Sequence, residues 1–422
     1  MNTSSTPHYQ ISFFSNDEQF LHIPDVSVSV PCTATVDNLN TLVNKTLENA
    51  SDKEWKSVNF DFLIDSMLLR TNLAEFVEQY GTPTESVIRV ECILREPLPS
   101  PDCDITLDDW VASVKTTTLF ITAATYSGEI SLYSYSGKLL SSVAAHDGAV
   151  KCVDVVAAGS GCRVVSGGND QTIVISEVAR TTNTVVPTHV LRGHERSVEC
   201  VAANKEGTRL VSGAFDTMLK VWNLEKDDES TTFTKGADVK SKKKRTDVVT
   251  KMPMVTLAGH KEVIVGVKWL PCSKKDVVTV SWDHTILLWD LELAGYTGSL
   301  SSTKSFTCVS TCPSNGLIIT GSVDPVIRLW DPRSREGSLV KQSFIGHNGW
   351  VSSLCWSPTK ENLFVSSSFD KISKMWDVRS PKAPLFDMKG HSDRILCCDW
   401  SIEQCIVSGG VDCTVKTFRT NS

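Results

Sequence analysis

The chain lacks the features of membrane and secreted proteins. None of its 422 residues belong to an apolar run that approaches the roughly 20 residues of a membrane-spanning helix. The start, MNTSSTPHYQ, has neither the basic nor the apolar region of a secretory signal peptide. A basic excess is also missing, since 42 Lys and Arg against 49 Asp and Glu give a net charge of −7. We therefore expect a soluble intracellular protein with no membrane partner and no extensive phosphate binding.

Catalytic and metal-binding motifs are missing too. The sequence contains no GxxxxGK[ST], GxGxxG, HExxH or GxSxG motif, so we expect no enzyme activity and no cofactor. The 14 Cys residues are scattered, and no CxxC pair has zinc spacing. The simplest interpretation is a set of reduced, mostly buried thiols.

A repeat accounts for several of the 11 Trp residues. Four segments, SGAFDTMLKVWN, TVSWDHTILLWD, TGSVDPVIRLWD and SSSFDKISKMWD, place an Asp six residues before a Trp. Degenerate copies keep Asp170 and Asp412, and a seventh has Ser127 and Tyr133. The steps between turn positions are 43, 46, 67, 41, 46 and 42 residues, so one copy carries an insertion beyond the ~40–45 residues of a propeller blade.

Two further markers precede the turn Asp. A His lies 21 to 24 residues upstream in five copies, and a Ser or Thr lies four residues upstream in six. Such groups can form a hydrogen-bond relay to the Trp indole, with these expected members: His194, Ser212, Asp216 and Trp222; His260, Thr279, Asp283 and Trp289; His347, Ser366, Asp370 and Trp376. Because the trio recurs in copy after copy, we reject a Ser–His–Asp catalytic triad.

These markers resemble the WD-repeat family, whose blades carry GH and WD signatures. The resemblance implies a mainly β protein with a seven-bladed WD40 β-propeller over residues 109–422. The residue before a turn Asp tends to reach one rim of this fold, so Phe215, Trp282 and Phe369 are candidate partner-binding anchors. Packing of each ring onto a neighbouring blade is an equally good interpretation.

Residues 1–95 carry none of these markers and predict a separate domain. We expect strands at YQISFF and SVSV, followed by an amphipathic helix at VDNLNTLVNKTLEN with Asp37 as its cap. We then expect a hairpin formed by VNFDFLID and SMLLR, a second helix at NLAEFVEQYG and a closing strand at SVIRVECIL. This order predicts a small α+β ubiquitin-like (β-grasp) domain. Residues 96–108 contain three prolines within five residues and are expected to be a linker, with 104–107 supplying a strand that closes the propeller.

The longest step between repeats contains a polar insertion near 225–252. Within it, Lys240, Lys242, Lys243, Lys244 and Arg245 form a basic run. Such a run is typical of a nuclear localisation signal or a nucleic-acid patch, and a solvated disordered loop is the plainer alternative. A disordered loop and an import signal are compatible, because an import receptor binds a flexible segment.

Longer motifs indicate which more specific families the two parts of the chain resemble. FDFLI, LLRTNLAEF and TESVIRVEC resemble the Notchless-like N-terminal domain, and LDDWVASV, LWDPRSREGSLV, GHNGWVSSLCWSP and WDVRSPKAPLFD resemble the WD-repeat protein 12 family. Together they cover nearly the whole chain. The resemblance implies a scaffold of the nucleolus and nucleoplasm that acts on pre-60S particles in maturation of the large ribosomal subunit and its rRNA. Its implied partners are pescadillo and, through the propeller, the block-of-proliferation WD protein.

The resemblance also implies a role for one acidic residue. In this family, a carboxylate before the last strand of the N-terminal domain completes the coordination of a divalent ion on midasin, an AAA ATPase that releases the complex. The matching residue is Glu85 in TPTESVIRVEC, and a carboxylate oxygen suits a hard, Mg²⁺-like ion. Glu75, Glu78 and Glu91 are its rivals by position, but the first two are expected in a helix and the third in a strand.

Two other functions remain open from the sequence. One is a Notchless-type factor on a later pre-60S particle, although the propeller of that family has an extra blade. The other is a WD40 substrate receptor of a ubiquitin ligase, which would need an F-box or an adaptor helix where the N-terminal domain stands.

Overall fold

The computed structural model describes residues 7–17, 20, 23, 26–50, 55–158, 161–179, 182–225, 248–271, 273–333 and 340–420. Its contacts divide the chain into two compact units, and each is described by itself. The first comprises Met1–Leu98 together with the short segment Asp377–Pro384, and the second comprises Pro99–Trp376 and Leu385–Ser422.

The N-terminal unit is a five-stranded sheet with two helices. Its elements are β1 (His8–Phe14), β2 (Ser27–Pro31), α1 (Val36–Ala50), β3 (Phe60–Ile64), β4 (Met67–Leu68), α2 (Leu73–Tyr80) and β5 (Ile88–Leu94). The sheet order is β2-β1-β5-β3-β4. β1 pairs with β5 in parallel, and the other neighbours pair antiparallel. This is the strand order of a β-grasp fold, and the predicted small α+β domain is confirmed.

Amphipathic spacing determines how α1 packs. Leu39, Val43 and Leu47 recur at helical intervals and are fully buried in the same core as Phe60 and Phe62 of β3. The cap of this helix is not Asp37, which lies in its first turn. Instead, the amide and hydroxyl of Thr35, the residue before the helix, both donate to Oδ1 of Asn38, at 3.0 and 2.9 Å, which is the backward half of a capping box.

The second helix is closed at both ends by its own sequence. Oδ1 of Asn72 accepts a hydrogen bond from the amide of Glu75 at 2.9 Å and so caps α2 at its N-terminus. Gly81 follows Tyr80 with φ +66°, a left-handed conformation that glycine adopts without strain, and its amide donates to the carbonyl of Val77. The chain then enters the loop that carries Glu85.

The second unit contains seven sheets within the described residues. We number these blades along the chain. The first four consist of β7 (Val111–Thr116), β8 (Ile121–Thr125), β9 (Glu129–Tyr133) and β10 (Leu139–Ala144); β11 (Val150–Ala158), β12 (Gly161–Gly168), β13 (Thr172–Val178) and β14 (Val185–Arg192); β15 (Val198–Ala203), β16 (Arg209–Ala214), β17 (Met218–Asn223) and β19 (Val255–Ala258); and β20 (Ile264–Trp269), β21 (Asp276–Ser281), β22 (Thr285–Asp290) and β23 (Gly295–Ser301).

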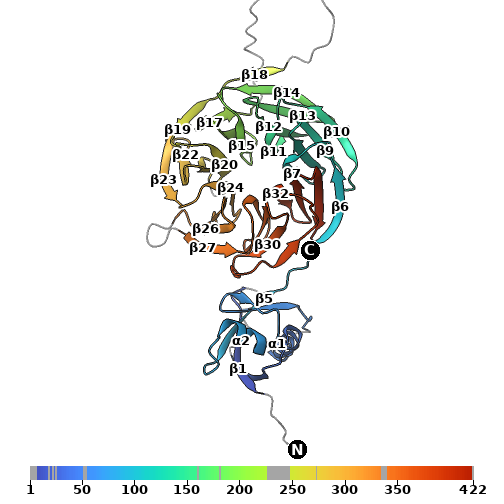
Figure 1. Ribbon diagram of the computed structural model, residues 1–422, viewed down its shortest axis with the longest axis vertical. Coiled ribbons are helices and arrows are strands. Elements are labelled where there is room, and N and C mark those ends of the chain that lie inside the picture. The colour runs from blue at the N-terminus through green and yellow to red at the C-terminus, as the bar shows by residue number, and fades with distance from the viewer. Residues whose placement is uncertain are drawn as a thin grey trace, which may run out of the picture. The chain divides into compact units, whose positions relative to one another are not determined.

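The last three blades complete a ring. They consist of β24 (Phe306–Thr311), β25 (Ile318–Ser322), β26 (Val326–Trp330) and β27 (Val340–Ile345); β28 (Val351–Trp356), β29 (Leu363–Ser368), β30 (Ser373–Asp377) and β31 (Phe386–Met388); and β32 (Ile395–Ile402), β33 (Cys405–Gly410), β34 (Thr414–Arg419) and β6 (Ser100–Thr106). The first strands of successive blades contact one another around the centre, and β32 contacts β7 (Figure 1). The chain is therefore mainly β with a seven-bladed propeller, as the repeat predicts.

Strand β6 closes this ring. It pairs antiparallel with β34 and so joins the start of the propeller to its end. The strand occupies Ser100–Thr106, inside the stretch 96–108 that we expected to be a linker. The pairing covers the edge of β34, gives the last blade its fourth strand, and links the first and last blades through the chain.

One strand of the insertion joins a neighbouring blade. β18 (Val249–Lys251) follows β17 of blade 3 in the chain, but it pairs in parallel with β14 as a fifth strand of blade 2. The ammonium of Lys251 donates to the carbonyl of Glu225 at 2.9 Å and so ties the two ends of the insertion together. The basic run at 240–245 lies outside the described residues.

Large side chains fill the blades. Trp222, Trp289, Trp330 and Trp376 are the largest of the fully buried side chains, with at most 1% of their surface exposed. Across the described part of the chain, no helix has the length and apolar character that crossing a bilayer requires.

Candidate partner-binding sites

A relay of hydrogen bonds runs through three blades. In blade 4, Nδ1 of His260 lies 2.9 Å from Asp283, its Nε2 lies 2.7 Å from Oγ1 of Thr279, and the indole of Trp289 donates to the same Oγ1 at 2.7 Å. The same bonds, at 2.7 to 2.8 Å, join His194, Ser212, Asp216 and Trp222 in blade 3 and His347, Ser366, Asp370 and Trp376 in blade 6.

The carboxylate determines the direction of each relay. Asp283 can only accept, so Nδ1 of His260 carries the proton and Nε2 accepts from the hydroxyl of Thr279. The hydroxyl oxygen in turn accepts from the indole of Trp289. Burial lowers the pKa of His260 further than Asp283 raises it, which keeps the ring neutral.

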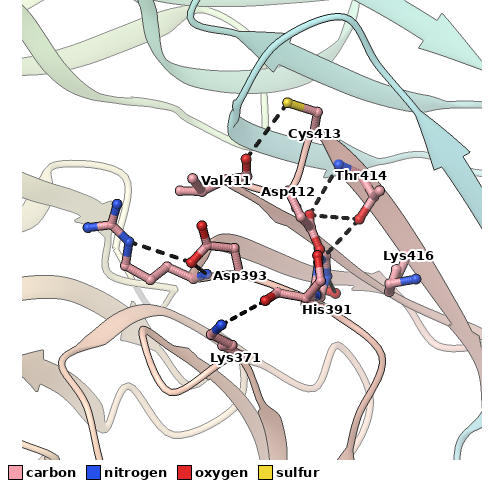
Figure 2. A network of polar contacts seen from close by, with 12 residues as sticks. Lys371, His391, Asp393, Val411, Asp412, Cys413, Thr414 and Lys416 are labelled. Atoms are coloured by element: carbon pink, nitrogen blue, oxygen red, sulfur yellow. Dashed lines mark hydrogen bonds and ion pairs between the residues drawn. The ribbon is translucent and has the colours of Figure 1, made fainter.

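The degenerate blades keep parts of the relay. In blade 7, Asp412 lies between His391 and Thr414 at 2.9 and 2.8 Å (Figure 2). In blade 2, the Trp position holds Ser176, whose buried hydroxyl has no hydrogen-bond partner. Blade 5 has no His at the loop position, and Arg328 pairs with Asp324 at 2.7 Å instead.

The turn carboxylates of blades 2, 3, 4, 6 and 7 have depressed pKa values. For Asp170, desolvation would raise the pKa, but the hydrogen bonds and charge of His146 and the hydrogen bonds of Thr172 outweigh it and lower the pKa to about 2. The pKa values of Asp216, Asp283, Asp370 and Asp412 are lowered for the same kind of reason. Each carboxylate also accepts the amide after its His, as Lys261 donates to Asp283 at 2.9 Å. The His–Asp bond thereby fixes two surface loops of each of these five blades against each other.

A backbone hydrogen bond brings these two loops to one face of the propeller. In every blade, the amide of the residue that opens the turn donates to the carbonyl of the residue before the first strand, at 2.8 to 3.1 Å. The seven pairs are Tyr126 and Trp110, Asn169 and Ala149, Phe215 and Ser197, Trp282 and Val263, Val323 and Ser305, Phe369 and Trp350, and Val411 and Arg394. Because the bond recurs, all of these residues lie on the same face, which we call the turn face.

The predicted anchors lie on the turn face in two separate groups. Phe215 and Trp282 form an edge-to-face pair, with ring centroids 5.5 Å apart. Phe369 instead stacks on Trp350 at 5.6 Å, with the guanidinium of Arg394 5.5 Å from its centroid. Trp282 and Trp350 are 43% and 51% exposed. Each ring packs on a neighbour, as the second interpretation of the sequence expects, and aromatic surface stays open at Trp282 and Trp350. Their role as partner-binding anchors stays a prediction.

Sequence reasoning missed half of this aromatic surface. Trp350 and Trp110 precede the first strands of their blades, and Trp110 packs edge-to-face on Tyr126 with centroids 5.6 Å apart. The ammonium of Lys151 lies 4.5 Å from the Tyr126 centroid. The available signal was an aromatic residue directly before a strand that begins with Val, as in DWV and GWV.

Hydrogen bonds from thiols link the first strands of neighbouring blades, beneath the loops of the turn face. Cys152, Cys200, Cys308 and Cys397 each occupy the third position of a first strand, and their thiols lie 3.6 to 3.9 Å from the carbonyl of the next blade's first position. Burial raises the pKa of Cys308 to about 12, so this thiol stays protonated and able to donate. The scattered cysteines of the sequence are in part a repeated seam between blades.

The residues at the fifth position of the first strands form a second layer of hydrogen bonds between neighbouring blades, and we call them the fifth-position layer. Asp154, Ser310, Cys355 and Asp399 each accept the amide of the sixth position in the next blade, at 2.8 to 3.2 Å. Asp399 also pairs with the ammonium of Lys115 at 2.9 Å across the closure of the ring. The remaining three members of the layer are Lys115, Ala202 and Lys268.

Glu85 lies in the loop between α2 and β5 and is exposed. No hydrogen bond or ion pair joins its carboxylate to any other residue in the described ranges. Its rivals differ, because Glu75 accepts from the side chain of its cap Asn72 at 2.8 Å and Glu91 accepts from Asn16 at 2.8 Å. Glu78 is exposed on α2.

The described residues contain no group of three or more His, Cys, Asp or Glu side chains that could hold a metal ion.

Comparison with known proteins identifies the family. The NLE (NUC135) domain model matches residues 9–77, and the WD domain, G-beta repeat model matches 137–175, 185–223, 251–290, 294–331, 338–377 and 382–419. The chain is 59% identical over 403 residues to "Ribosome biogenesis protein WDR12 homolog" of Brugia malayi, a match that covers 95% of this chain and 93% of that protein. The chain belongs to the WDR12 family of ribosome biogenesis proteins.

Other WDR12 homologs match over similar lengths. That of Caenorhabditis briggsae is 44% identical over 431 residues, covering 98% of this chain and 96% of its own. That of Anopheles gambiae is 40% identical over 422 residues, covering 99% and 96%. The resemblance to the WD-repeat protein 12 family is confirmed. Blade 1 of this WDR12-family propeller lies mostly outside the six matched repeats, in line with its replacement of the turn Asp by Ser127 and of the Trp by Tyr133.

Proposed function

We propose that this WDR12-family protein is a non-enzymatic scaffold for maturation of the large (60S) ribosomal subunit and processing of its rRNA. It acts in the nucleolus and nucleoplasm on pre-60S particles, in a complex with pescadillo and the block-of-proliferation WD protein. The propeller binds the latter, and the N-terminal domain docks on midasin. Family membership and the two-unit architecture support this proposal.

The availability of Glu85 carries the docking part of the proposal. A carboxylate that completes a metal site on another protein must be exposed and uncommitted, and among the four acidic candidates Glu75 and Glu91 already accept hydrogen bonds. The loop also ends beside two exposed apolar side chains, Tyr80 and Val87, which are 48% and 44% accessible. An anion flanked by apolar surface suits an interface that excludes water around a bound cation.

The test measures metal-dependent binding of the full chain to the midasin domain that carries the metal site. We expect Glu85→Ala to weaken binding in Mg²⁺ by at least about 10-fold, or about 1.4 kcal/mol. Glu85→Asp should also weaken it, because the carboxylate reaches one methylene less far. Binding of both variants to pescadillo and the block-of-proliferation protein should persist.

Glu78→Ala is the matched control, since it removes an exposed carboxylate from the neighbouring helix. Equal loss in Glu78→Ala and Glu85→Ala would indicate a general charge effect. Unchanged affinity of Glu85→Ala in Mg²⁺, or wild-type binding that survives EDTA, would refute the assignment of Glu85 as the metal-completing residue.

The aromatic pairs of the turn face are the proposed anchors for a protein partner of the propeller. Phe215 with Trp282, and Phe369 with Trp350, expose large rings that are already held in place by packing and by the relay. A pre-ordered ring loses little conformational freedom on binding, which is why such residues dominate interface energies.

A further inference from the structure

The first strands of the propeller surround a deep cavity. Its volume is about 620 Å³, within the range of about 300–1,000 Å³ that is usual for small-molecule sites. Tyr126, Trp282, Trp350 and Phe369 line its mouth on the turn face, and it extends down to the fifth-position layer at Lys115, Lys268, Cys355 and Asp399. The first and fifth positions of a strand are on the order of 13 Å apart.

Two members of that layer, Lys115 and Lys268, carry an ammonium group, and a third is Ala202. In four blades the fifth position accepts an amide of the next blade, and an ammonium group cannot accept. Lys115 cannot accept either, but Asp399 neutralises it at 2.9 Å. Lys268 makes no hydrogen bond and no ion pair with any residue that the structure describes.

The other charges of the cavity are matched. Lys151 lies over the ring of Tyr126 and interacts electrostatically with Glu199, whose pKa is raised chiefly by burial. Lys115 pairs with Asp399. The lining holds three lysines against two carboxylates, Glu199 and Asp399. Lys115 has an ion pair and Lys151 a ring contact, and Lys268 has neither with any residue that the structure describes.

Among the described residues, no carboxylate lies within ion-pair distance of Lys268. Its charge acts on the thiols of Cys200, Cys308 and Cys355, and for each of them burial raises the pKa and keeps the group neutral. A partly buried ammonium without a counter-ion is unfavourable. An anion bound in the cavity would remove that cost.

We propose that the propeller cavity is a binding site for a small oxyanion, a phosphate or carboxylate group that pairs with Lys268. The ligand is a small molecule rather than a side chain of a docked protein. An Asp or Glu side chain held at the aromatic mouth is too short to reach the fifth-position layer, whereas the cavity volume accommodates a free molecule.

The experiment compares thermal unfolding of the full chain in chloride with unfolding in inorganic phosphate or in citrate, at equal ionic strength. A ligand present at about 100 times its dissociation constant raises the melting temperature of the wild type by several degrees. A shift in phosphate alone would indicate a phosphate site, and a shift in citrate alone would indicate a carboxylate site. Lys268→Met should abolish the shift, and Lys304→Met, which removes an exposed lysine outside the cavity, should retain it.

Two further measurements make the test independent of folding defects. In chloride alone, Lys268→Met should be at least as stable as the wild type, because it removes an uncompensated cation; a marked loss of stability would instead indicate a structural role and count against the proposal. The ³¹P resonance of phosphate should broaden with the wild type and not with Lys268→Met. An equal thermal shift in both proteins, as expected of general stabilisation by phosphate, or no shift in either anion, would overturn the proposal.

Discussion

Replacing Thr279 by Val in blade 4 tests the relay most directly. The Thr279 side chain is fully buried, and its hydroxyl forms hydrogen bonds with both the indole of Trp289 and the ring of His260. Val has nearly the same shape but neither donates nor accepts. The substitution therefore leaves the indole N–H without an acceptor and Nε2 of His260 without a donor, while the packing around the site is preserved.

The expected cost follows from these two orphaned groups. Each buried polar group that loses its partner costs about 1–3 kcal/mol, and the added methyl group returns a fraction of that by burial. We expect a net loss of about 2–4 kcal/mol in the free energy of unfolding. Thr279→Ser keeps the hydroxyl and should cost about 1 kcal/mol for the lost methyl group. Blades 3 and 6 already use Ser212 and Ser366 at this position.

Urea unfolding monitored by tryptophan fluorescence measures the difference. Trp55 is the only one of the 11 Trp residues that precedes the propeller, so the signal reports the propeller. A double-mutant cycle with Trp289→Phe should show coupling of about 1 kcal/mol, because Phe removes the donor that Thr279→Val orphans. The relay would lose its energetic role if Thr279→Val were as stable as Thr279→Ser, or if the two substitutions were additive.

Two predictions concern acid stability and import. Burial lowers the pKa of His260 and His391 below 6.5 in the folded chain, so the unfolded chain binds more protons and stability should fall as the pH drops below about 6.5. The lowered pKa of Asp170, about 2, contributes stability that is present above pH 3.8 and is lost as the pH falls toward 2. Urea midpoints measured from pH 8 to pH 3 check both, and a midpoint that stays flat between pH 7.5 and 5 contradicts the histidine prediction. Deleting 240–245 should reduce nuclear accumulation of a fluorescently tagged protein, and normal accumulation would show that another signal or a partner carries the chain.

The parts of the fold that the sequence predicts depend on short, repeated spacings. An Asp six residues before a Trp, with a hydroxyl four residues earlier, identifies a turn and its flanking strands within a dozen residues. The N-terminal domain is predictable for a similar reason, since Leu39, Val43 and Leu47 define the buried face of one helix. These patterns follow from the geometry of single helices, strands and turns, and residue periodicity in a sequence reflects that local geometry.

Features that join distant segments could not be predicted in this way. β18 lies in the insertion of blade 3 but extends the edge of blade 2, and its exposed, three-residue strand has no alternation that would assign it to either. Trp350 was missed for a related reason. Its position is defined by a backbone hydrogen bond from Phe369, 19 residues further along, and not by distance from the turn Asp.

The first strands of the blades show how a comparison by position within the strand reveals features that join distant segments. Composition alone describes the cysteines as scattered buried thiols, and it describes Lys268 as one of 42 basic residues. Aligned by position in the first strand, four cysteines share the third place and donate to the next blade, while the fifth place is an acceptor in four blades and an ammonium in two. Lys115 has Asp399 beside it, whereas Lys268 forms no ion pair with a described residue. A departure from a repeated structural role, at a partly buried place that lines a cavity, is a stronger indication of binding than the residue type itself, because the other blades show what the fold needs at that position.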